Sequence, residues 1–527
     1  MKRKIVEISR NEIKDLIQKL ENASLDVSDH KILKDILVSY LGLNDEILDR
    51  KASILRLRRM LFGSKTESSK NILKQFNKAG KDSARANSHS NKKGKGHGRK
   101  SASAYKSAEK IKISHSELKH GDPCPECNEG TVYCMKNPRV VVRITGGAPF
   151  KAKIYELERL RCNLCLTLFK AKLPEEAGEE KYDEKAKAMV PILRYGSGFP
   201  HFRLENLQDS LGHPFPDSNQ WDLINELSEI VEPVYNELLS QAAGGNIIHS
   251  DDTNMKILSL MNIDKKLYEK QKRTGIFTSG FLSEKGPYKI ALFFTGKKHA
   301  GENMEELLRL RPDNLSPPIH MCDALSRNLP KKFKTLLAHC LAHGRRNFSD
   351  LILVFPKECE HVINELALVY QNDAFTKESG MSGLERLGYH KMHTRKIMDR
   401  LKRWCNSKLE KKEVEPNSSL GKAITYLLNH WKPLTLFLRK EKAPIDNNIC
   451  EQALKMSILH RKNSLFFKTE NGARIGDMFM GLIHSCNLNS INPFDFFITL
   501  QKNKAQVKID PEKWLPWNYL NKDKFDN

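Results

Sequence analysis

Five apolar segments separated by turn signals restrict the middle of this 527-residue chain to a β-sheet interrupted by one helix. Their β-branched and aromatic content predicts strands, and Ser283–Pro287 predicts a tight turn between the second and the third. A helical pattern at Glu302–Leu310 separates the third strand from the fourth. The predicted strands are residues 245–260, 275–283, 288–294, 317–322 and 336–341. The predicted order is therefore three strands, a helix and two strands.

Three acidic residues lie in or beside predicted elements. Asp251 lies in the first strand, Asp323 directly follows the fourth, and Glu451 lies on a predicted helix. Mg²⁺ takes oxygen ligands and keeps several waters, and a rigid strand can present a carboxylate to it. Two such ions about 3.5–4 Å apart stabilise the attacking and leaving oxygens of an in-line displacement. The three acids are therefore candidate ligands of two Mg²⁺ ions for phosphoryl transfer on nucleic acid, with water or a DNA 3′-hydroxyl as nucleophile.

Each acid also has a structural interpretation. Asp251 and Asp252 are compatible with a solvated strand end. Asp323 is compatible with the N-cap of a following helix. Asn448 and Glu451 have the spacing of a capping box. The residues alone leave these alternatives open, and only the combination of the three acids points to a metal site.

The cysteines predict a structural zinc site. Two Cys-x-x-Cys pairs flank a segment with β-strand character at 140–144 and 153–157. Four thiolates on two tight turns can form the closed tetrahedron of structural Zn²⁺, and the alternative is redox motifs or free thiols. The remaining seven of the eleven cysteines, Cys134 among them, are expected to pack as small hydrophobes. The predicted zinc ligands are Cys124, Cys127, Cys162 and Cys165.

The net charge of +24 predicts a polyanionic partner, and nucleic acid is the natural one. Residues 64–112 carry 14 Lys and Arg against 3 Asp and Glu, an excess of 11, and are too polar to bury a core. This segment is expected to lie along the phosphate backbone without reading sequence, and the alternative is a merely solvated basic linker. The predicted phosphate contacts are Lys92, Lys93, Lys95, Arg99 and Lys100.

The remaining segments read as helical. An apolar seam with alternating spacings of four and three predicts a long helix ending near Gly63, either in a coiled-coil dimer or packed within its own chain. Tyr182–Leu239 predicts a helical connector, and Leu351–Leu438 predicts helices between the fifth strand and Glu451. The seam consists of Ile36, Tyr40, Leu43, Ile47, Arg50, Ile54, Leu57 and Leu61.

Several segments together resemble the IS66-family transposases. Ile445–Leu454 and Arg461–Phe466 resemble the family's Asp-Asn-Asn, Glu-Arg-Ala-Leu and Arg-Lys-Asn signature, and Ala338–Phe348 resembles its Cys-Trp-Ala-His-Ala-Arg-Arg motif. The chain departs from the family pattern at Asp252, Leu341 and Gln452, where many relatives have Glu, Trp and Arg, and Gln452 cannot neutralise a phosphate. The other segments that resemble family motifs are Leu57–Gly63, His249–Thr253 and Leu515–Tyr519.

The resemblance implies a DDE transposase of multidomain α+β class. Asp251, Asp323 and Glu451 fall on the catalytic triad of an RNase H-like (retroviral integrase-like) domain. The family implies that the insertion, with its basic stretch Lys391–Lys412 around Trp404, grips DNA ends, and a packed basic helix is the alternative. His343 either orders a DNA end or is a satisfied histidine. Phosphate-clamping roles are expected for Arg345, Arg346, Arg461 and Lys462, since arginine binds phosphate bidentately.

The expected activity is Mg²⁺-dependent cleavage at the terminal inverted repeats of a mobile element and joining of the freed 3′-hydroxyl to target DNA. The alternatives are a regulatory DNA-binding relic and a metal-dependent nuclease without strand transfer. Small accessory proteins and at least a homodimer are the expected partners besides DNA. The chain lacks an apolar run of about 18 residues and an apolar segment near Met1, so a cytoplasmic, nucleoid-associated bacterial protein is expected.

Eight regions follow from these patterns. They are an N-terminal helical region (1–63), a basic flexible linker (64–118), a zinc-ribbon DNA-binding domain (119–175), a helical connector (176–243), the first part of the catalytic core (244–348), a helical insertion (349–440), the Glu-bearing helix of the core (441–485) and a C-terminal tail (486–527).

Overall fold

The computed structural model describes residues 8, 10–62, 117–126, 129–133, 147–161, 168–178, 180–261 and 275–520. The chain forms two units, one of residues 1–81 with 153–527 and one of residues 82–152. In the second unit, Pro123 and Thr131 form an isolated antiparallel bridge. In the first unit, helices surround a mixed five-stranded sheet, so the chain is of mixed α and β class.

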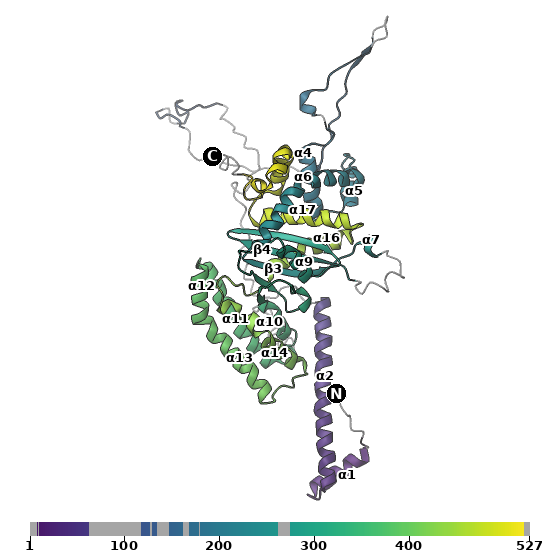
Figure 1. Cartoon of the computed structure of the whole chain (residues 1–527), viewed down its shortest axis with the longest axis vertical. Coiled ribbons are helices and arrows are strands. Elements are labelled where there is room, and N and C mark those ends of the chain that lie inside the picture. Colours follow the sequence, from purple (N-terminus) through teal and green to yellow (C-terminus); the bar gives the residue numbers. More distant parts are fainter. Residues whose placement is uncertain are drawn as a thin grey trace. The chain divides into compact units, whose positions relative to one another are not determined.

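The sheet has the strand order β5-β4-β3-β6-β7. Its strands β3 and β4 are labelled in Figure 1. β3, β4 and β5 form an antiparallel meander, and β6 and β7 run parallel to β3. Helix α9 (Ala300–Leu308) connects β5 to β6, which confirms the predicted order of three strands, a helix and two strands. Gly286 has a φ of 59° in the tight β4–β5 turn, a conformation that favours glycine. The strands are β3 (Ile247–Asn254), β4 (Phe277–Lys285), β5 (Tyr288–Gly296), β6 (Ile319–Cys322) and β7 (Leu336–His339).

Two predicted strands are shorter than expected. β3 ends at Asn254, where its pairing with β4 ends, and Leu258–Met261 forms helix α7 instead of continuing the strand. The chain leaves the sheet there because Ile257 pairs with Phe467 in a separate parallel bridge. β7 ends at His339, because the amide of Leu341 donates to the carbonyl of Ile445 and helix α10 (Leu341–Ser349) begins.

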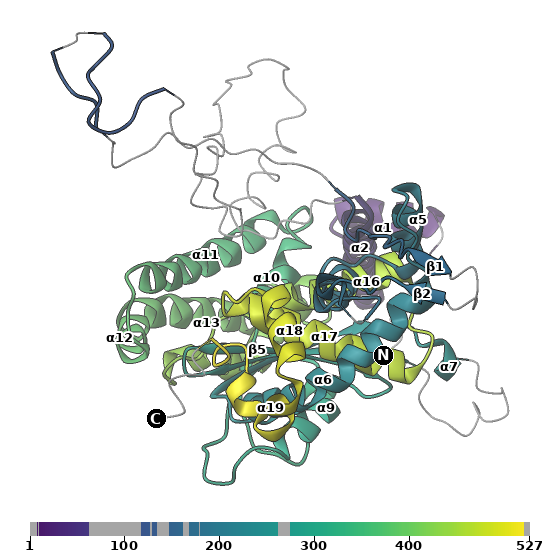
Figure 2. The same cartoon turned by 90° about the horizontal axis from the view of Figure 1, so that it is seen from above.

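Different helices cover the two faces of β4 and the edge of β5. Gly280 faces α16 (Asn448–Ser464), whereas Ser279 and Ser283 bond to α9 and to α6 (Asp217–Ala243). Helix α17 (Glu470–Leu488) runs along the open edge of β5 (Figure 2). Its Asp477 and Ser485 accept bonds from the edge amides, so the edge cannot pair with another strand.

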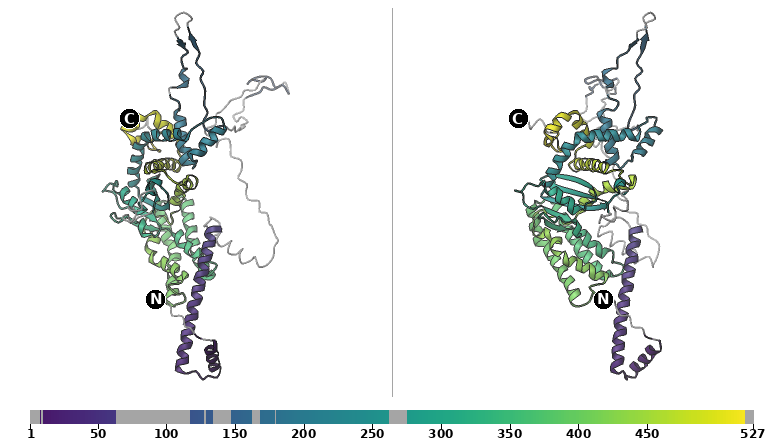
Figure 3. Two further views of the ribbon diagram at one scale, coloured as in Figure 1. Left: turned by 90° about the vertical axis from the view of Figure 1, so that its right-hand side faces the viewer. Right: turned by 45° about the vertical axis from the view of Figure 1, so that its right-hand side comes forward.

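The predicted helical connector and helical insertion are both present. α4 (Glu184–Pro191), α5 (His201–Ser210) and α6 are separated by breaks at the predicted Gly and Pro positions. The insertion lies beside the sheet and shares its hydrophobic core (Figure 3). The helices of the insertion are α11 (Pro356–Glu378), α12 (Gly383–Tyr389), α13 (Arg395–Glu410), α14 (Ser419–Asn429) and α15 (Trp431–Leu434), and the C-terminal helices are α18 (Pro493–Lys502) and α19 (Lys504–Ile509).

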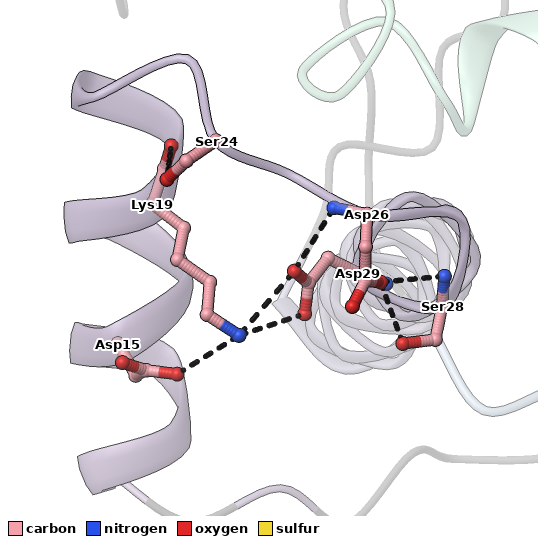
Figure 4. Close-up of polar contacts among 6 residues, drawn as sticks. All are labelled: Asp15, Lys19, Ser24, Asp26, Ser28 and Asp29. Atoms are coloured by element: carbon pink, nitrogen blue, oxygen red, sulfur yellow. Dashed lines mark hydrogen bonds and ion pairs between the residues drawn. The ribbon is translucent and has the colours of Figure 1, made fainter.

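At the N-terminus, α1 (Arg10–Glu21) is joined to α2 (Val27–Phe62), which ends where the sequence predicts. Lys19 of α1 joins the two helices through an ion pair with Asp29 of α2 at 3.4 Å, and it also pairs with Asp15 within α1 at 3.3 Å (Figure 4). Ala52 is buried in the core of the insertion, which matches packing within the chain. Seam residues such as Ile47 nevertheless stay exposed, so the coiled coil stays a prediction.

The predicted zinc site falls mostly outside the described residues. Cys124 is half-buried, while Cys127, Cys162 and Cys165 are not among the residues described. Two short antiparallel strands, β1 (Arg159–Arg161) and β2 (Leu168–Lys170), flank the second cysteine pair in sequence, and residues 153–157 form no strand. Lys92 to Lys100 also lie outside the described residues. Among the helices that the structure describes, none has the length and apolarity needed to cross a membrane.

Candidate active site

The alternation of side chains along β3 decides which acid faces which helix. Asp251 is paired with Gly280 of β4, so both positions lie on the same face of the sheet. A Cβ atom on Gly280 would lie 2.7 Å from Cδ2 of Leu454 on α16. The missing side chain therefore lets α16 approach the strand closely. Glu451, about one helical turn before Leu454, is held on the face where Asp251 lies.

The parallel register of β3 and β6 places the two aspartates at the same level. His249 is paired with Met321; Asp251 lies two residues further along β3, and Asp323 lies two residues further along the chain, just past the end of β6. Neighbouring strands are about 4.8 Å apart, so the two carboxylates start from adjacent backbone positions. Asp323 is not a helix N-cap, because that position before the following 3-10 turn belongs to Leu325. Its carboxylate instead accepts a hydrogen bond from the side-chain amide of Asn328.

The three carboxylates interact electrostatically. Burial is the main cause that raises the pKa of Asp251 to about 7; the negative charges of Asp323 and Glu451 add to the rise, while the Asp252 amide, 2.9 Å from the carboxylate, opposes it. Oε1 of Glu451 is buried without a hydrogen-bond partner. Acidic groups that lie close together and leave a buried oxygen unsatisfied are suited to a divalent cation, which would stabilise all three charges.

Asp252 has a different role on the opposite face. Its side chain is only 2% exposed and accepts hydrogen bonds from Ser279 Oγ at 2.6 Å and from the Ala300 amide at 3.1 Å. His299 Nδ1 lies 3.4 Å from the same carboxylate. Asp252 therefore anchors the start of α9 to the sheet. Neither Asp251 nor Asp252 is a solvated strand end.

Asn447 fixes the start of α16. Its side-chain amide donates to the Ser250 carbonyl at 3.0 Å, and its Oδ1 lies 3.0 Å from Nδ1 of His249. Burial lowers the pKa of His249 to about 4, so the neutral ring donates its Nδ1 proton to Asn447. The capping box suggested by Asn448 and Glu451 is not formed, because the side chain of Asn448 bonds to that of Asp446. Glu451 is therefore left with its carboxylate available.

Cys340 and His343 of α10 lie beside Glu451. Cys340 occupies the N-cap of α10, and its Sγ accepts a hydrogen bond from the Asn447 amide at 3.3 Å. His343 Nδ1 lies 3.9 Å from Glu451 Oε1. Ligand atoms of the three residues all lie within 4.8 Å of one another. The two segments that resemble motifs of the family, around residues 340 and 450, are far apart in sequence but lie next to each other in the structure.

The basic residues expected near the site lie in different environments. Arg345 is buried, and its guanidinium lies over the ring of Tyr370 at 5.0 Å from the centroid. Arg346 is half-buried on the same helix. Arg461 donates to Thr253 Oγ1 at 3.1 Å and to the Asn254 carbonyl, which joins the end of α16 to the end of β3. Lys462 is exposed.

From the sequence, Cys340 was expected only to pack as a small hydrophobe, and Asn447 and Asn328 had no expected role. Asn447 and Cys340 stand inside motifs that were noted, and a polar residue directly before an acid-bearing helix was a usable signal for Asn447. Asn328 reaches Asp323 through a 3-10 turn, and nothing in its sequence context indicates this contact.

An aspartate on β3, an aspartate at the end of the adjacent β6 and a glutamate on the helix over the same face define a candidate site for divalent cations. The chain belongs to the IS66 transposase family, whose model, described as "Transposase IS66 family", matches residues 181–475, more than half of the chain. The matched segment contains the whole sheet, the insertion and all three acids.

Three relatives from Sinorhizobium fredii (strain NBRC 101917 / NGR234) are similar to this chain, and all are named as uncharacterized proteins. The protein y4jD is 32% identical over 187 residues, 35% of this chain and 36% of its own length. The protein y4qI is 23% identical over 350 residues, 64% of this chain and 62% of its own. The protein y4hP is 22% identical over 396 residues, 70% and 69% of the two chains. The matches therefore span about a third of y4jD and three fifths of y4qI.

Proposed function

We propose that this chain is a DDE-type DNA transposase with an RNase H-like catalytic domain. The observation that carries the proposal is the parallel register of β3 and β6, which leads to Asp251 on β3 and to Asp323 just past β6, with Glu451 on the helix α16 that packs against the Asp251 face. Membership of the IS66 transposase family makes DNA the natural substrate. The sheet order supports the RNase H-like fold, which remains an inference from topology.

In this proposal Asp251, Asp323 and Glu451 would hold two Mg²⁺ ions, and such ions would supply positive charge to neutralise the attacking and leaving oxygens. A water molecule would lose a proton to solvent as its oxygen bonds to phosphorus at the element end, and the P–O3′ bond would break, with the leaving 3′ oxygen taking up a proton to become a hydroxyl. That hydroxyl would then lose its proton as its oxygen bonds to a target phosphorus, and the displaced 3′ oxygen would take up a proton. The protein contributes positioning, because β3 and β6 fix the aspartates while Asn447 fixes α16.

The other parts are proposed to bind DNA. The paired cysteines would hold structural Zn²⁺, and the basic segment from Lys92 to Lys100 would follow the phosphate backbone. Arg346 and Lys462 are proposed to contact phosphates near the carboxylates, and a similar role for Arg345 and Arg461 would require them to leave their present partners. The eight regions, the small accessory proteins and the dimer expected from sequence are part of the same proposal.

The test is cleavage and joining of a labelled duplex carrying the element's terminal repeat. The native chain is compared with Glu451→Gln and Asp323→Asn, each with Mg²⁺ and with EDTA. We expect Mg²⁺-dependent nicking and joining by the native chain and neither step by the variants, while all three bind the duplex. Comparable cleavage by Asp323→Asn would refute the triad. Cleavage without joining would indicate a nuclease, and binding without cleavage in the presence of accessory proteins would indicate a regulatory relic.

A further inference from the structure

Cys340, His343 and Glu451 form a compact set of mixed ligand types. Their ligand atoms lie within 4.8 Å of one another, and the His343 Nδ1 to Glu451 Oε1 distance is 3.9 Å. Zn²⁺ binds sulfur at about 2.3 Å and nitrogen or oxygen at about 2.0–2.2 Å, so a tetrahedron separates its ligand atoms by roughly 3.3–3.8 Å. Closing the set around Zn²⁺ therefore requires movements of no more than about 1 Å.

Two of the three donors lack another partner. Nδ1 of His343 and Oε1 of Glu451 are both buried atoms without a hydrogen bond. Unsatisfied buried polar atoms are rare in folded proteins and point to an unseen ligand or ion. A cation between these two atoms would satisfy both.

The third donor, Cys340, is placed to become a thiolate on binding metal. It lies at the N-cap of α10 and accepts from the amide of Asn447 at the N-terminus of α16, so two helix N-termini favour negative charge there. Burial raises the pKa of Cys340 to about 12, and the Asn447 and His343 amides oppose this rise. Binding therefore releases the thiol proton as the S–Zn bond forms.

We propose that Cys340, His343 and Glu451 form a Zn²⁺ site that overlaps the carboxylate site, with water as the fourth ligand. Thiolate and imidazole favour Zn²⁺ over Mg²⁺, which prefers oxygen ligands alone. Because Glu451 belongs to both sets, Zn²⁺ bound here withdraws it from Asp251 and Asp323 and inhibits the reaction. The metal site rests on the geometry of the three residues, whereas the inhibition rests on the proposed function.

The binding test uses the full chain dialysed against buffered Zn²⁺, with bound zinc measured by mass spectrometry. Native chain is compared with Cys340→Ser and His343→Ala, and Cys405→Ser removes another buried thiol as a control. We expect the native and Cys405→Ser chains to bind one more zinc ion than the Cys340→Ser and His343→Ala chains. The affinity for that ion should fall more than about tenfold in the other two, because even outer-shell partners contribute that much. Equal zinc content and affinity in all four chains would refute the site.

Co²⁺ provides a spectroscopic readout of the same site. A thiolate-to-cobalt absorption band should form in native chain and be weaker in Cys340→Ser, and thermal unfolding shows whether each variant is folded. If Cys340→Ser does not fold, His343→Ala decides, because His343 is partly exposed.

Inhibition is measured as the ratio of Mg²⁺-dependent cleavage with and without added Zn²⁺. We expect a lower ratio in the native chain than in His343→Ala, and equal ratios would overturn the inhibition. A chain that binds the extra zinc but never cleaves DNA would refute the proposed function and leave the zinc site standing. Cleavage without extra zinc would refute only the site.

Discussion

Asp251 and Asp252 are neighbours in sequence but face opposite sides of the sheet. Asp251 shares its face with α16 and lies near two other acids, while Asp252 is fully engaged at the start of α9. Strand geometry is the cause, because successive side chains point to opposite faces. Substitutions at these two positions should therefore change stability in opposite directions.

We expect Asp252→Ala to lower the free energy of unfolding by about 1–3 kcal/mol, because it leaves the buried Ala300 amide and Ser279 hydroxyl without an acceptor. Asp251→Asn should raise the stability of the metal-free chain, because it removes a buried charge near two other acids. The same variant should abolish cleavage. Urea unfolding in EDTA measures the stability of both variants. A loss of stability in Asp251→Asn would contradict this division of roles.

Asn447 should act on catalysis through position. Asn447→Ala leaves the Ser250 carbonyl and the His249 Nδ1–H unsatisfied, which costs about 1–3 kcal/mol for each buried group. We expect cleavage to fall by about 100-fold, the typical effect of a shift of 1 Å, with DNA affinity unchanged. Asn448→Ala is the matched control, since Asn448 is exposed. Similar losses in both variants would argue against a specific role for Asn447.

At the scale of elements, the contact of α16 with β4 sets the position of Glu451. Gly280→Ala would place a methyl group 2.7 Å from Leu454 Cδ2 and push the helix away. We expect a loss of about 1–3 kcal/mol from overpacking and reduced cleavage. Adding Leu454→Ala should restore part of the cleavage rate because it makes room for the methyl group. Gly296→Ala, where a Cβ meets no atom within 4 Å, is the control.

The helical insertion depends on a buried ion-pair cluster. Asp373 of α11 pairs with Arg386 at 2.5 Å and Lys377 at 2.8 Å, with His390 Nε2 at 3.4 Å. Burial alone would raise the pKa of Asp373, but its bonds to His390, Arg386 and Lys377 outweigh burial and hold the pKa well below its ordinary value. A depressed folded-state pKa stabilises the fold above the unfolded pKa of about 3.9, and this stabilisation is lost as pH falls further.

We expect Asp373→Asn to destabilise the insertion by about 1–3 kcal/mol at pH 7, because it removes the buried negative charge that pairs with the half-buried Arg386. The difference from the native chain should shrink as pH falls below about 4, because Asp373 of the unfolded chain then takes up a proton while the folded chain still keeps the charge. Hydrogen exchange of α11 and α13 measures both effects. Asp399→Asn, on the exposed side of α13, should behave as native, and a pH-independent difference would contradict the ion-pair explanation.

At the scale of the whole molecule, the net charge of +24 should make DNA binding strongly salt-dependent. We expect replacement of the basic residues from Lys92 to Lys100 by Gln to weaken binding and to reduce the slope of log affinity against log salt by about 0.9 for each lost phosphate contact. Fluorescence anisotropy at several salt concentrations measures the slope. The control is the double variant Lys31→Gln, Lys34→Gln on α2. An unchanged slope in the Lys92 to Lys100 variant would indicate that this segment is a solvated linker that does not contact phosphates.

Much of the fold was predictable because its signals are local. Strand and helix periodicity gave the order of elements in the sheet, the connector and the insertion, and turn residues gave the β4–β5 hairpin. The extension of the first strand to residue 260 was wrong, because Ile257 pairs with Phe467, some 200 residues away in sequence. The register of β3 with β6 was not predictable for the same reason, since pairing between distant strands leaves no local pattern.

The sequence by itself determined the three acids, the order of the elements around them and the resemblance to a transposase family, since periodicity and motifs are properties of neighbouring residues. Only the tertiary structure decided that Asp251 faces α16 while Asp252 faces α9, that Arg345 is buried, and that Cys340 and His343 lie beside Glu451. The physical reason is separation along the chain. His249 and Asn447, whose bond fixes the helix over the strand, are 198 residues apart, and only packing of the folded chain brings them together.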